Sequence, residues 1–296
     1  MGMRILYTES PAWEGPLRAG EQIIASDRFT LSKDIPRNRA GLLVLDHFGV
    51  VFVKRMAAAS WVRGIAWRLR GSPAARSLRA ARELAQTGFL FPRPLAAADC
   101  LATGAIRVSW LFSEALTQAA MFSVFLDRRR GGQRLQWRWR RAVLAAVATT
   151  IRRMHEEGLF SSDLQETNLM LEGEPEQLQI YFVDLDGLRR LPRVSWRRRR
   201  RNLVQLDRSV GRFLSRSERL HFLRAYLGTP WPPARLKSLL EKLAQERAHK
   251  DRVYARRRQL ARPGRFEHSA NDHRTVGLFG RLSTPSRVNR NGLFDQ

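Results

Sequence analysis

The sequence of 296 residues contains a single cysteine, Cys100. One cysteine forms no internal disulfide, so the chain lacks the bridges of small secreted domains and we expect a reducing compartment. Long apolar runs are also missing. The longest, Ala142 to Ile151, is about half a membrane span and has arginines on both sides. The first residues, Met1 to Leu6, lack the apolar core and cleavage site of a signal peptide. These absences predict a soluble, cytoplasmic protein.

Acidic residues are scarce. The chain has 27 Asp and Glu against 53 Lys and Arg, a formal net charge of +26. Residues 187–265 alone hold 24 Lys and Arg against 5 Asp and Glu, and Arg197 to Arg201 are consecutive. Such a surface attracts polyanions: nucleic acid, anionic lipid headgroups or a phosphorylated substrate. The competing interpretation is a solubilising surface in an arginine-rich genome. No stacking-aromatic or zinc motif accompanies the arginines, so we expect no specific nucleic-acid partner.

Strand-like segments come before helix-like segments along the chain. Short apolar runs bounded by turn residues predict strands at residues 29–31, 42–45, 50–53 and 106–112. Helical spacing predicts a helix that stops at Gly88, then helices over 119–126, 137–157, 202–227 and 233–260. This order is typical of an α+β fold. We expect a small β-rich lobe (1–112), a larger helical lobe (113–261) and a basic, partly disordered tail (262–296).

Two motifs in the second half of the chain carry the strongest functional signal. Asp163 is followed five residues later by Asn168 and an apolar run, and a second apolar run, Ile180 to Val183, ends in Asp184. Phosphoryl transfer requires a carboxylate that accepts the proton of the acceptor hydroxyl. It also requires an amide and a second carboxylate that hold Mg²⁺ against the phosphates of ATP. The two motifs, in this order, predict a kinase catalytic loop followed by a metal-binding strand end.

These residues also have purely structural interpretations. Asp163 fits a cap on a turn after the long helix, and Asn168 alone is typical of a turn. Asp184 and Asp186 fit an ordinary β-turn with the sequence Asp-Leu-Asp-Gly. We predict that Asp163 is the catalytic base and that Asn168 and Asp184 are metal ligands, with Asp186 as the close competitor of Asp184.

Lys54 is the predicted contact to the nucleotide phosphates. It ends the apolar run Val50–Val53, as does the lysine on the corresponding strand of protein kinases. Glu83 is the only carboxylate between Asp46 and Asp99, so it is the only local partner for Lys54 on the intervening helix. A surface glutamate among arginines explains Glu83 equally well.

A glycine-rich phosphate-binding loop is missing. Residues 33–41 contain one glycine and no G-x-G-x-x-G pattern. If this segment covers the phosphates, the side chains of Lys33, Arg37, Asn38 and Arg39 must provide much of the charge and hydrogen bonding. We assign Lys33 and Arg37 to nucleotide binding.

The six histidines are scattered, and with one cysteine they give no zinc-ligand spacing. His155 lies in the last turn of the predicted helix 137–157, where a cation interacts favourably with the helix dipole. We expect no catalytic role for it.

At these residues the chain resembles the lipopolysaccharide kinase family, the Kdo and heptose kinases with a protein-kinase-like fold. The resemblance extends over roughly residues 25–260. Its motifs are Val53-Lys54-Arg55, the segment Gly88–Ala96, Met154–Gly158, Asp163 with Asn168, Val183–Asp186, and the region Arg201–Tyr226. The chain departs from the family at Ser161, often a histidine there, and in lacking an early glutamate on the helix around residues 76–82.

The resemblance implies a bilobal α+β fold, ATP and Mg²⁺ as cofactors, and a sugar hydroxyl of the lipopolysaccharide inner core as acceptor. It places the enzyme as a peripheral protein on the inner face of the inner membrane, with a lipid-linked core oligosaccharide and an anionic membrane surface as partners. The roles of Lys54, Asp163, Asn168 and Asp184 follow by matching motif. Two alternatives stay open: a kinase-like enzyme acting on a protein or another small molecule, and a degenerate kinase fold that only binds.

Overall fold

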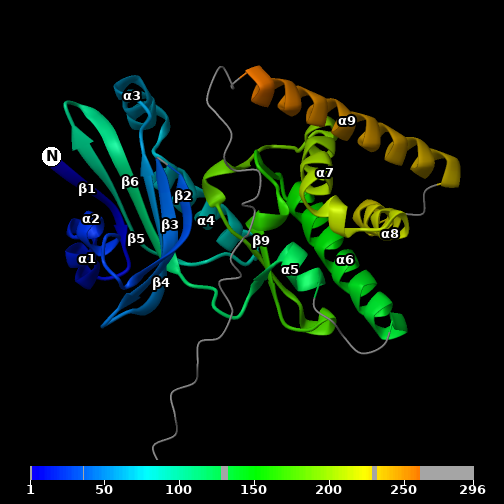
Figure 1. Cartoon of the computed structure of the whole chain (residues 1–296), viewed down its shortest axis with the longest axis horizontal. Helices are drawn as coiled ribbons and strands as arrows, with labels where there is room; N and C mark the ends of the chain where they lie inside the picture. The colour runs from blue at the N-terminus through cyan, green and yellow to red at the C-terminus, as the bar shows by residue number, and fades with distance from the viewer. Residues whose placement is uncertain (1, 36, 128–132, 229–231, 261–296) are drawn as a thin grey trace, which may run out of the picture.

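A computed structural model describes residues 2–35, 37–127, 133–228 and 232–260 (Figure 1). Strands dominate the N-terminal part and helices the C-terminal part, which confirms the predicted α+β order. The tail predicted over residues 262–296 lies outside the described residues. The apolar interior forms two main clusters, one under the N-terminal sheet and a larger one around the helices.

Six of the described strands form one antiparallel sheet in the order β1-β5-β6-β4-β3-β2. Their bounds are β1 Gly2–Thr8, β2 Phe29–Ile35, β3 Asn38–Leu45, β4 Gly49–Ala57, β5 Pro94–Ala102 and β6 Ala105–Glu114. In β4, Val51 and Val53 are buried in the cluster under the sheet. Because side chains alternate between the two faces of a strand, Lys54 projects from the opposite face.

The N-terminal segment covers the face of this sheet that carries the cluster. It folds into η1 (Pro11–Trp13), α1 (Glu14–Arg18) and α2 (Gly20–Ile23). Trp13 is buried, and its ring lies 4.0 Å from that of Phe48 and 5.7 Å from that of Phe112. Aromatic packing therefore fixes this segment to the sheet.

Two helices connect β4 to β5: α3 (Trp61–Arg70) and α4 (Pro73–Gln86). Each begins at a serine cap. The Ser60 hydroxyl accepts a hydrogen bond from the Arg63 amide, and the Ser72 hydroxyl accepts one from the Ala75 amide, both at 3.2 Å. Gly71, with φ of +91°, separates the two helices. The helix predicted to stop at Gly88 is therefore α4, and a second helix, α3, precedes it.

The C-terminal part packs around α6 (Gln133–Glu156), whose residues Val143, Leu144, Val147 and Ile151 are fully buried. The elements before α6 are β7 (Ala120–Met121) and α5 (Phe122–Leu126). After it come β8 (Leu159–Ser161), η2 (Glu166–Asn168), β9 (Leu169–Glu172), η3 (Pro175–Gln177), β10 (Gln179–Phe182), η4 (Leu185–Gly187) and β11 (Leu188–Arg190). The last helices are α7 (Trp196–Val210), η5 (Gly211–Phe213), α8 (Arg216–Leu227) and α9 (Pro233–Leu260).

The prediction of one helix over 202–227 was wrong. α7 starts at Trp196, so the arginine run lies inside a helix, and a break at Gly211–Ser215 separates α7 from α8. The break has a local cause. Ser215 caps α8, its hydroxyl accepting from the Glu218 amide while the Glu218 carboxylate accepts from the Ser215 amide. This reciprocal capping box is a strong helix start.

Gly158 links α6 to β8. Its φ is +78°, and a Cβ atom built on it would lie 2.3 Å from the carbonyl oxygen of Leu191. The Leu191 amide also donates to the Gly158 carbonyl at 2.9 Å. Only glycine fits a backbone approached this closely.

Candidate active site

The β9–β10 hairpin brings the two predicted motifs together. Leu169 pairs with Phe182 in its register, and the Val183 amide donates to the Asn168 carbonyl at 3.0 Å. Asn168 and Asp184, sixteen positions apart in the sequence, thus flank the same end of one hairpin. The motifs predict that Asn168 and Asp184 lie close together, and the register of β9 and β10 brings them there.

Asp163 lies in the loop after β8, exposed, while the neighbouring Leu164 is buried and anchors the loop. The side-chain amide of Asn168 donates to the backbone carbonyl of Asp163 at 2.8 Å. The backbone amide of Asp163 donates to the Ser161 hydroxyl at 3.2 Å. The side-chain amide of Gln165 donates to a carboxylate oxygen of Asp163 at 2.5 Å. The loop therefore holds both the backbone and the carboxylate of Asp163.

Lys54 reaches across from β4 and forms an ion pair with the Asp184 carboxylate. The side chains are 19% and 34% exposed, so both retain access to solvent. The pair joins the N-terminal sheet to the hairpin of the C-terminal part. It sets a cation next to a carboxylate where a nucleotide phosphate and its metal would need them.

Asp184 has a left-handed backbone, with φ of 56° and ψ of 58°. Only one other non-glycine residue with positive φ, Thr103, occurs in the part of the chain that the structure describes. Aspartate tolerates this region better than most residues, but the conformation still costs energy and persists only where neighbours enforce it. Its occurrence at a proposed metal ligand is typical of a functional site.

Arg76 of α4 holds the turn that follows. Its guanidinium donates to the Asp186 carbonyl at 3.2 Å and to the Asp186 carboxylate at 3.3 Å, and also to the Gly71 carbonyl at 2.9 Å. Burial raises the pKa of the Asp186 carboxyl, the nearby charge of Asp184 adds to the rise, and Lys54 and Arg76 oppose it. Asp186 thus has an arginine partner on α4, whereas Asp184 faces Lys54.

Glu83 does not pair with Lys54. Its carboxylate accepts a hydrogen bond from Arg190 of β11 at 3.2 Å, at the C-terminal half of α4. Glu83 lies two helical turns beyond Arg76, and this register directs it to β11 and not to the η4 turn. The candidate pair of Lys54 with Glu83 is therefore corrected. In the structure the carboxylate that pairs with Lys54 belongs to Asp184.

The two cations expected to cover the phosphates lie at the β2–β3 hairpin. Arg37 is exposed in the turn, and its carbonyl accepts from the Ala57 amide at 2.7 Å. Lys33 belongs to β2, and its side chain lies outside what the structure describes. The next strand, β3, pairs with the strand of Lys54 through Ala40, so the hairpin adjoins the site through the sheet.

Three polar residues of α7 form hydrogen bonds to the backbone of the catalytic loop and of the strand end before it. Asn202 donates to the Ser161 carbonyl and Gln205 to the Ser162 carbonyl, both at 2.7 Å, and the Ser209 hydroxyl accepts from the Glu166 amide at 2.9 Å. The sequence interpretation missed them. Their spacing of three and four places them on one helix face, and that pattern within an arginine-rich helix was the available signal.

His155 does not act as a cation at the end of α6, although the helix dipole there favours one. The ring is buried, with Nδ1 2.8 Å from the Tyr226 hydroxyl and Nε2 3.0 Å from Asn202 Oδ1. Burial lowers the pKa of His155 to about 4, so the imidazole is neutral at pH 7. Neutral His155 connects α6 and α8 to Asn202, and through it to the carbonyl of Ser161.

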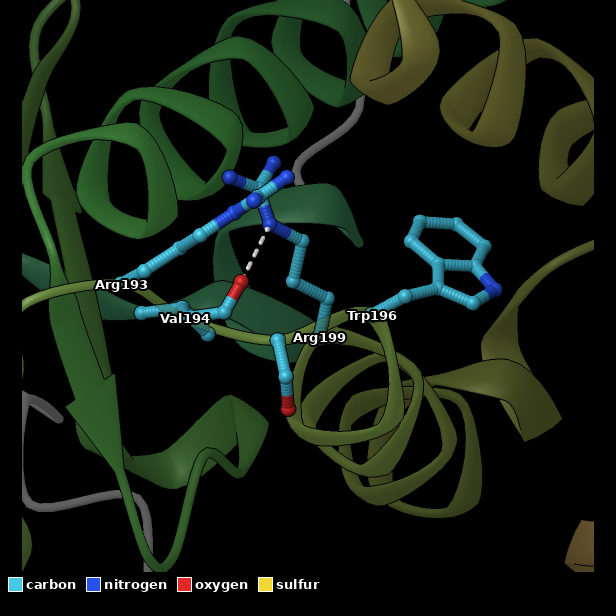
Figure 2. Close-up of a pocket in the computed structure, with 5 residues that line it drawn as sticks. Arg193, Val194, Trp196 and Arg199 are labelled. Atoms are coloured by element: carbon cyan, nitrogen blue, oxygen red, sulfur yellow. Dashed lines mark hydrogen bonds between the residues drawn. The ribbon is translucent and has the colours of Figure 1, made fainter.

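A pocket of about 490 Å³ opens before and around the start of α7 (Figure 2). It is lined by Arg193, Val194, Ser195, Trp196 and Arg199. Arg199 donates to the Val194 carbonyl at 3.2 Å and to the His155 carbonyl at 3.3 Å. Within the described ranges, neither Arg193 nor Arg199 has a carboxylate within ion-pair distance. The pocket therefore presents two guanidinium groups and an indole to a ligand.

The residues at the hairpin end fit a magnesium ion bound with a nucleotide. In the described part of the chain no group of three or more His, Cys, Asp or Glu could hold a metal alone. Mg²⁺ at phosphoryl-transfer sites uses one or two carboxylates and completes its shell with phosphate and water. Asp184 offers such a carboxylate. The Asn168 amide nitrogen is already bonded to the Asp163 carbonyl, which leaves its oxygen as the available ligand atom.

Comparisons with known proteins agree with this geometry. The model of the lipopolysaccharide kinase (Kdo/WaaP) family matches residues 48–226. No curated protein matches the chain. Among solved structures it is similar to "WaaP in complex with acyl carrier protein", with a TM-score of 0.60 and 21% identity over 84% of this chain and 99% of that one.

The Rio2 kinase–ADP/Mg²⁺–phosphoaspartate complex from Chaetomium thermophilum also matches, at 14% identity over 83% of this chain and 75% of that one. The TM-score of that match is 0.39. The likeness to WaaP concerns the fold, while the family model spans more than half of the sequence and includes Lys54, Asp163, Asn168 and Asp184. The chain therefore belongs to the lipopolysaccharide kinase (Kdo/WaaP) family and is a phosphotransferase.

Proposed function

We propose that the chain transfers the γ-phosphoryl group of ATP to a hydroxyl of Kdo or heptose in the lipopolysaccharide inner core. The observation that carries the proposal is the arrangement around one hairpin end. Asp163 and Asp184 lie on either side of Asn168, and Lys54 reaches Asp184 from the other part of the molecule. A base, a metal-ligand pair and a phosphate-binding cation are the parts that phosphoryl transfer needs.

Asp163 is the proposed catalytic base. Its carboxylate is exposed, so an acceptor hydroxyl can reach it, and the hydrogen bond from Gln165 leaves the second oxygen free to accept the hydroxyl proton. The hydrogen bonds from α7 fix the two carbonyls that directly precede Asp163, those of Ser161 and Ser162. A base held in this way needs little reorganisation when the substrate binds, which favours in-line attack on the phosphoryl group.

Lys54, Asn168 and Asp184 are the proposed nucleotide-binding residues. Lys54 would exchange part of its contact with Asp184 for the α- and β-phosphates, while Asn168 and Asp184 would hold Mg²⁺. The bound ion neutralises the charge that develops on the phosphates. Arg37, and Lys33 by its place in β2, would add positive charge from the β2–β3 hairpin, where no glycine-rich loop supplies backbone amides.

The arginine-rich segment 189–201 is the proposed binding surface for the acceptor. It follows the η4 turn directly, and the pocket of Arg193, Trp196 and Arg199 lies at the far end of α7 from Ser209. Arg199 and Gln205 are six residues apart on α7, roughly 9 Å by helical rise. Guanidinium groups recognise phosphate and carboxylate groups in two-pronged geometry, and an indole packs against a sugar ring. A phosphorylated, acidic oligosaccharide has both features.

We further propose that the enzyme works as a peripheral protein on the inner face of the inner membrane. No helix among the described residues is both long enough and apolar enough to span a bilayer. The acceptor is lipid-linked in this proposal, so the enzyme must bind it from the surface. The arginines would then contact anionic headgroups as well as acceptor phosphates.

The test is phosphoryl transfer by the purified chain from γ-labelled ATP with Mg²⁺ to isolated lipid-linked core oligosaccharide. Mass spectrometry of the product is expected to place one added phosphate on a Kdo or heptose residue, and Asp163→Asn is the matched inactive control. Labelling of a protein substrate with no label on the saccharide would favour the protein-kinase alternative. Nucleotide binding with no transfer to any acceptor would favour a degenerate kinase fold.

A further inference from the structure

Helix α3 carries a regular outward surface that the proposed reaction does not use. Its first three residues, Trp61, Val62 and Arg63, and its last three, Arg68, Leu69 and Arg70, are all exposed. The two triplets are seven residues apart, so their members align in three stripes along the helix. The middle stripe is Val62 and Leu69, bordered by Arg63 and Arg70 on one side and by Trp61 and Arg68 on the other. We name this surface the α3 ridge.

The opposite side of α3 is fixed to the sheet. Gly64 and Trp67 are buried, and a Cβ atom on Gly64 would lie 2.4 Å from the carbonyl oxygen of Ile106 in β6. Two border residues of the α3 ridge add contacts at its edge: the Trp61 indole donates to the Thr103 carbonyl at 3.2 Å, and Arg68 donates to the Gly104 carbonyl at 2.7 Å. The helix is therefore anchored along its length, and the outward direction of the α3 ridge follows from that anchoring.

The ridge exposes large apolar side chains. Val62 is 70% exposed, Leu69 80% and Trp61 53%. Two exposed aliphatic side chains in one stripe are unfavourable in water and mark a contact surface when they are grouped. The guanidinium groups of Arg63 and Arg70 have no carboxylate within ion-pair distance in the described residues. Apolar groups and unpaired cations thus share one face.

We infer that the α3 ridge binds the surface of an anionic membrane. Aliphatic side chains enter the boundary between headgroups and acyl chains, arginines contact anionic headgroups, and tryptophan is enriched at that depth. The ridge is the exposed face of one helix projecting beyond the sheet (Figure 1). A lipid surface adapts to a narrow projecting ridge, whereas a protein partner needs a matching groove.

The position of α3 agrees with this inference. In Figure 1, α3 stands at the upper end of the N-terminal sheet, and α9 runs along the upper edge of the C-terminal part with α7 below it. The inference rests on the proposed function only in that a membrane-bound acceptor gives the contact its purpose.

The test measures binding of the full chain to vesicles without nucleotide or acceptor. Sedimentation is compared between vesicles of phosphatidylethanolamine with phosphatidylglycerol and vesicles of phosphatidylcholine. The double variant Val62→Ser with Leu69→Ser is expected to bind the anionic vesicles about tenfold more weakly, since it removes both aliphatic anchors. The double variant Val44→Ser with Val50→Ser is the matched control, because these valines are 51% and 42% exposed and form a cross-strand pair of β3 and β4, away from α3.

The charges and the indole are tested separately. Arg63→Ser with Arg70→Ser is expected to weaken binding at low salt and leave little difference at high salt, where the arginine contribution is screened. Brominated lipids are expected to quench the tryptophan emission of the parent chain, and to quench that of Trp61→Phe less. Both results depend on the ridge touching lipid.

Equal vesicle binding by the parent and the Val62/Leu69 variant, with unchanged melting temperatures, would overturn the inference. So would unchanged vesicle binding together with a shift from a self-associated to a monomeric species, because the ridge would then join copies of this chain. The vesicles contain no substrate, so a failure of phosphoryl transfer with intact ridge-dependent binding would count against the proposed function alone.

Discussion

Arg76 donates hydrogen bonds to both the backbone carbonyl and the carboxylate of Asp186. The contact ties α4 to the turn that follows Asp184 and fixes the left-handed backbone at Asp184 from the C-terminal side. In this chain the helix packed beside the site presents a cation to an aspartate of the turn, and Lys54 takes its carboxylate from Asp184. Each aspartate of the turn thus has its own cation: Lys54 for Asp184 and Arg76 for Asp186.

Arg76→Ala is expected to lower kcat/KM about 10- to 100-fold, because hydrogen bonds to a charged partner contribute roughly 1.5–3 kcal/mol and their loss frees the turn that positions Asp184. Arg79→Ala on the same helix is the control, since Arg79 donates to the Arg70 carbonyl and to no other group among the described residues. Steady-state kinetics with thermal melting of each variant checks the prediction. A normal rate in Arg76→Ala would show that the turn holds its shape without α4.

Asp163→Asn and Asp184→Asn are both expected to abolish turnover, by different routes. Loss of the base should lower kcat about 10²- to 10⁴-fold and leave Mg·ATP binding nearly unchanged. Loss of the metal ligand should weaken Mg·ATP binding as well. Titration calorimetry with Mg·ATP separates the two. Near-normal turnover in either variant would contradict the assignment of that residue.

Lys54→Ala is expected to lower activity strongly, whereas Glu83→Ala should change it less than about threefold. Glu83 pairs with Arg190 at the surface, and both side chains are about one-third exposed or more. Exposed ion pairs contribute roughly 0.2–1 kcal/mol to stability. Parallel assays of the two variants check this. Equal losses would mean that Glu83 moves to Lys54 during the reaction.

His155 is expected to make the free energy of unfolding depend on pH. Its pKa is about 4 in the folded protein, against the ordinary value of 6.5 that we take for the unfolded chain. The unfolded chain therefore takes up a proton first as the pH falls. The stabilisation is complete above pH 6.5 and decreases towards pH 4, by up to about 3 kcal/mol.

Denaturant unfolding at several pH values checks this, with His155→Gln as the comparison. The variant should be less stable at pH 7 and should lack the His155 part of the pH dependence. Parallel stability–pH curves for the two proteins would mean that His155 has the same pKa in the folded and unfolded states.

The order of strands before helices and the residues gathered at the candidate site were readable from the sequence because their signals are local. Lys54 follows an alternating run, and the strands that carry Asn168 and Asp184 are short apolar segments next to polar residues. What the sequence did not give depends on long-range packing. β5 was missed because Ala96, Ala97 and Ala98 have low strand propensity, yet all three are fully buried in the middle of the sheet.

Other misses have different causes. The break before α8 was signalled by Ser215 and Glu218, a capping pattern hidden in a continuous helical periodicity. The neutral state of His155 follows from burial between three helices, which no local pattern reports. The partner of Lys54 is a residue 130 positions away, so nearness in sequence favoured the wrong carboxylate, Glu83.

Gly158 has a consequence for comparing relatives of this chain. The backbone of Leu191 comes so near that no side chain fits at residue 158, and the same contact sets where β8 and β11 begin to pair. A displacement there would move Asp163 and Arg193 apart, since one follows β8 and the other β11. A relative with any other residue at this position must have rebuilt the strand pair. The identity of that one residue therefore separates relatives that keep this spacing between catalytic loop and arginine pocket from those that keep only the fold.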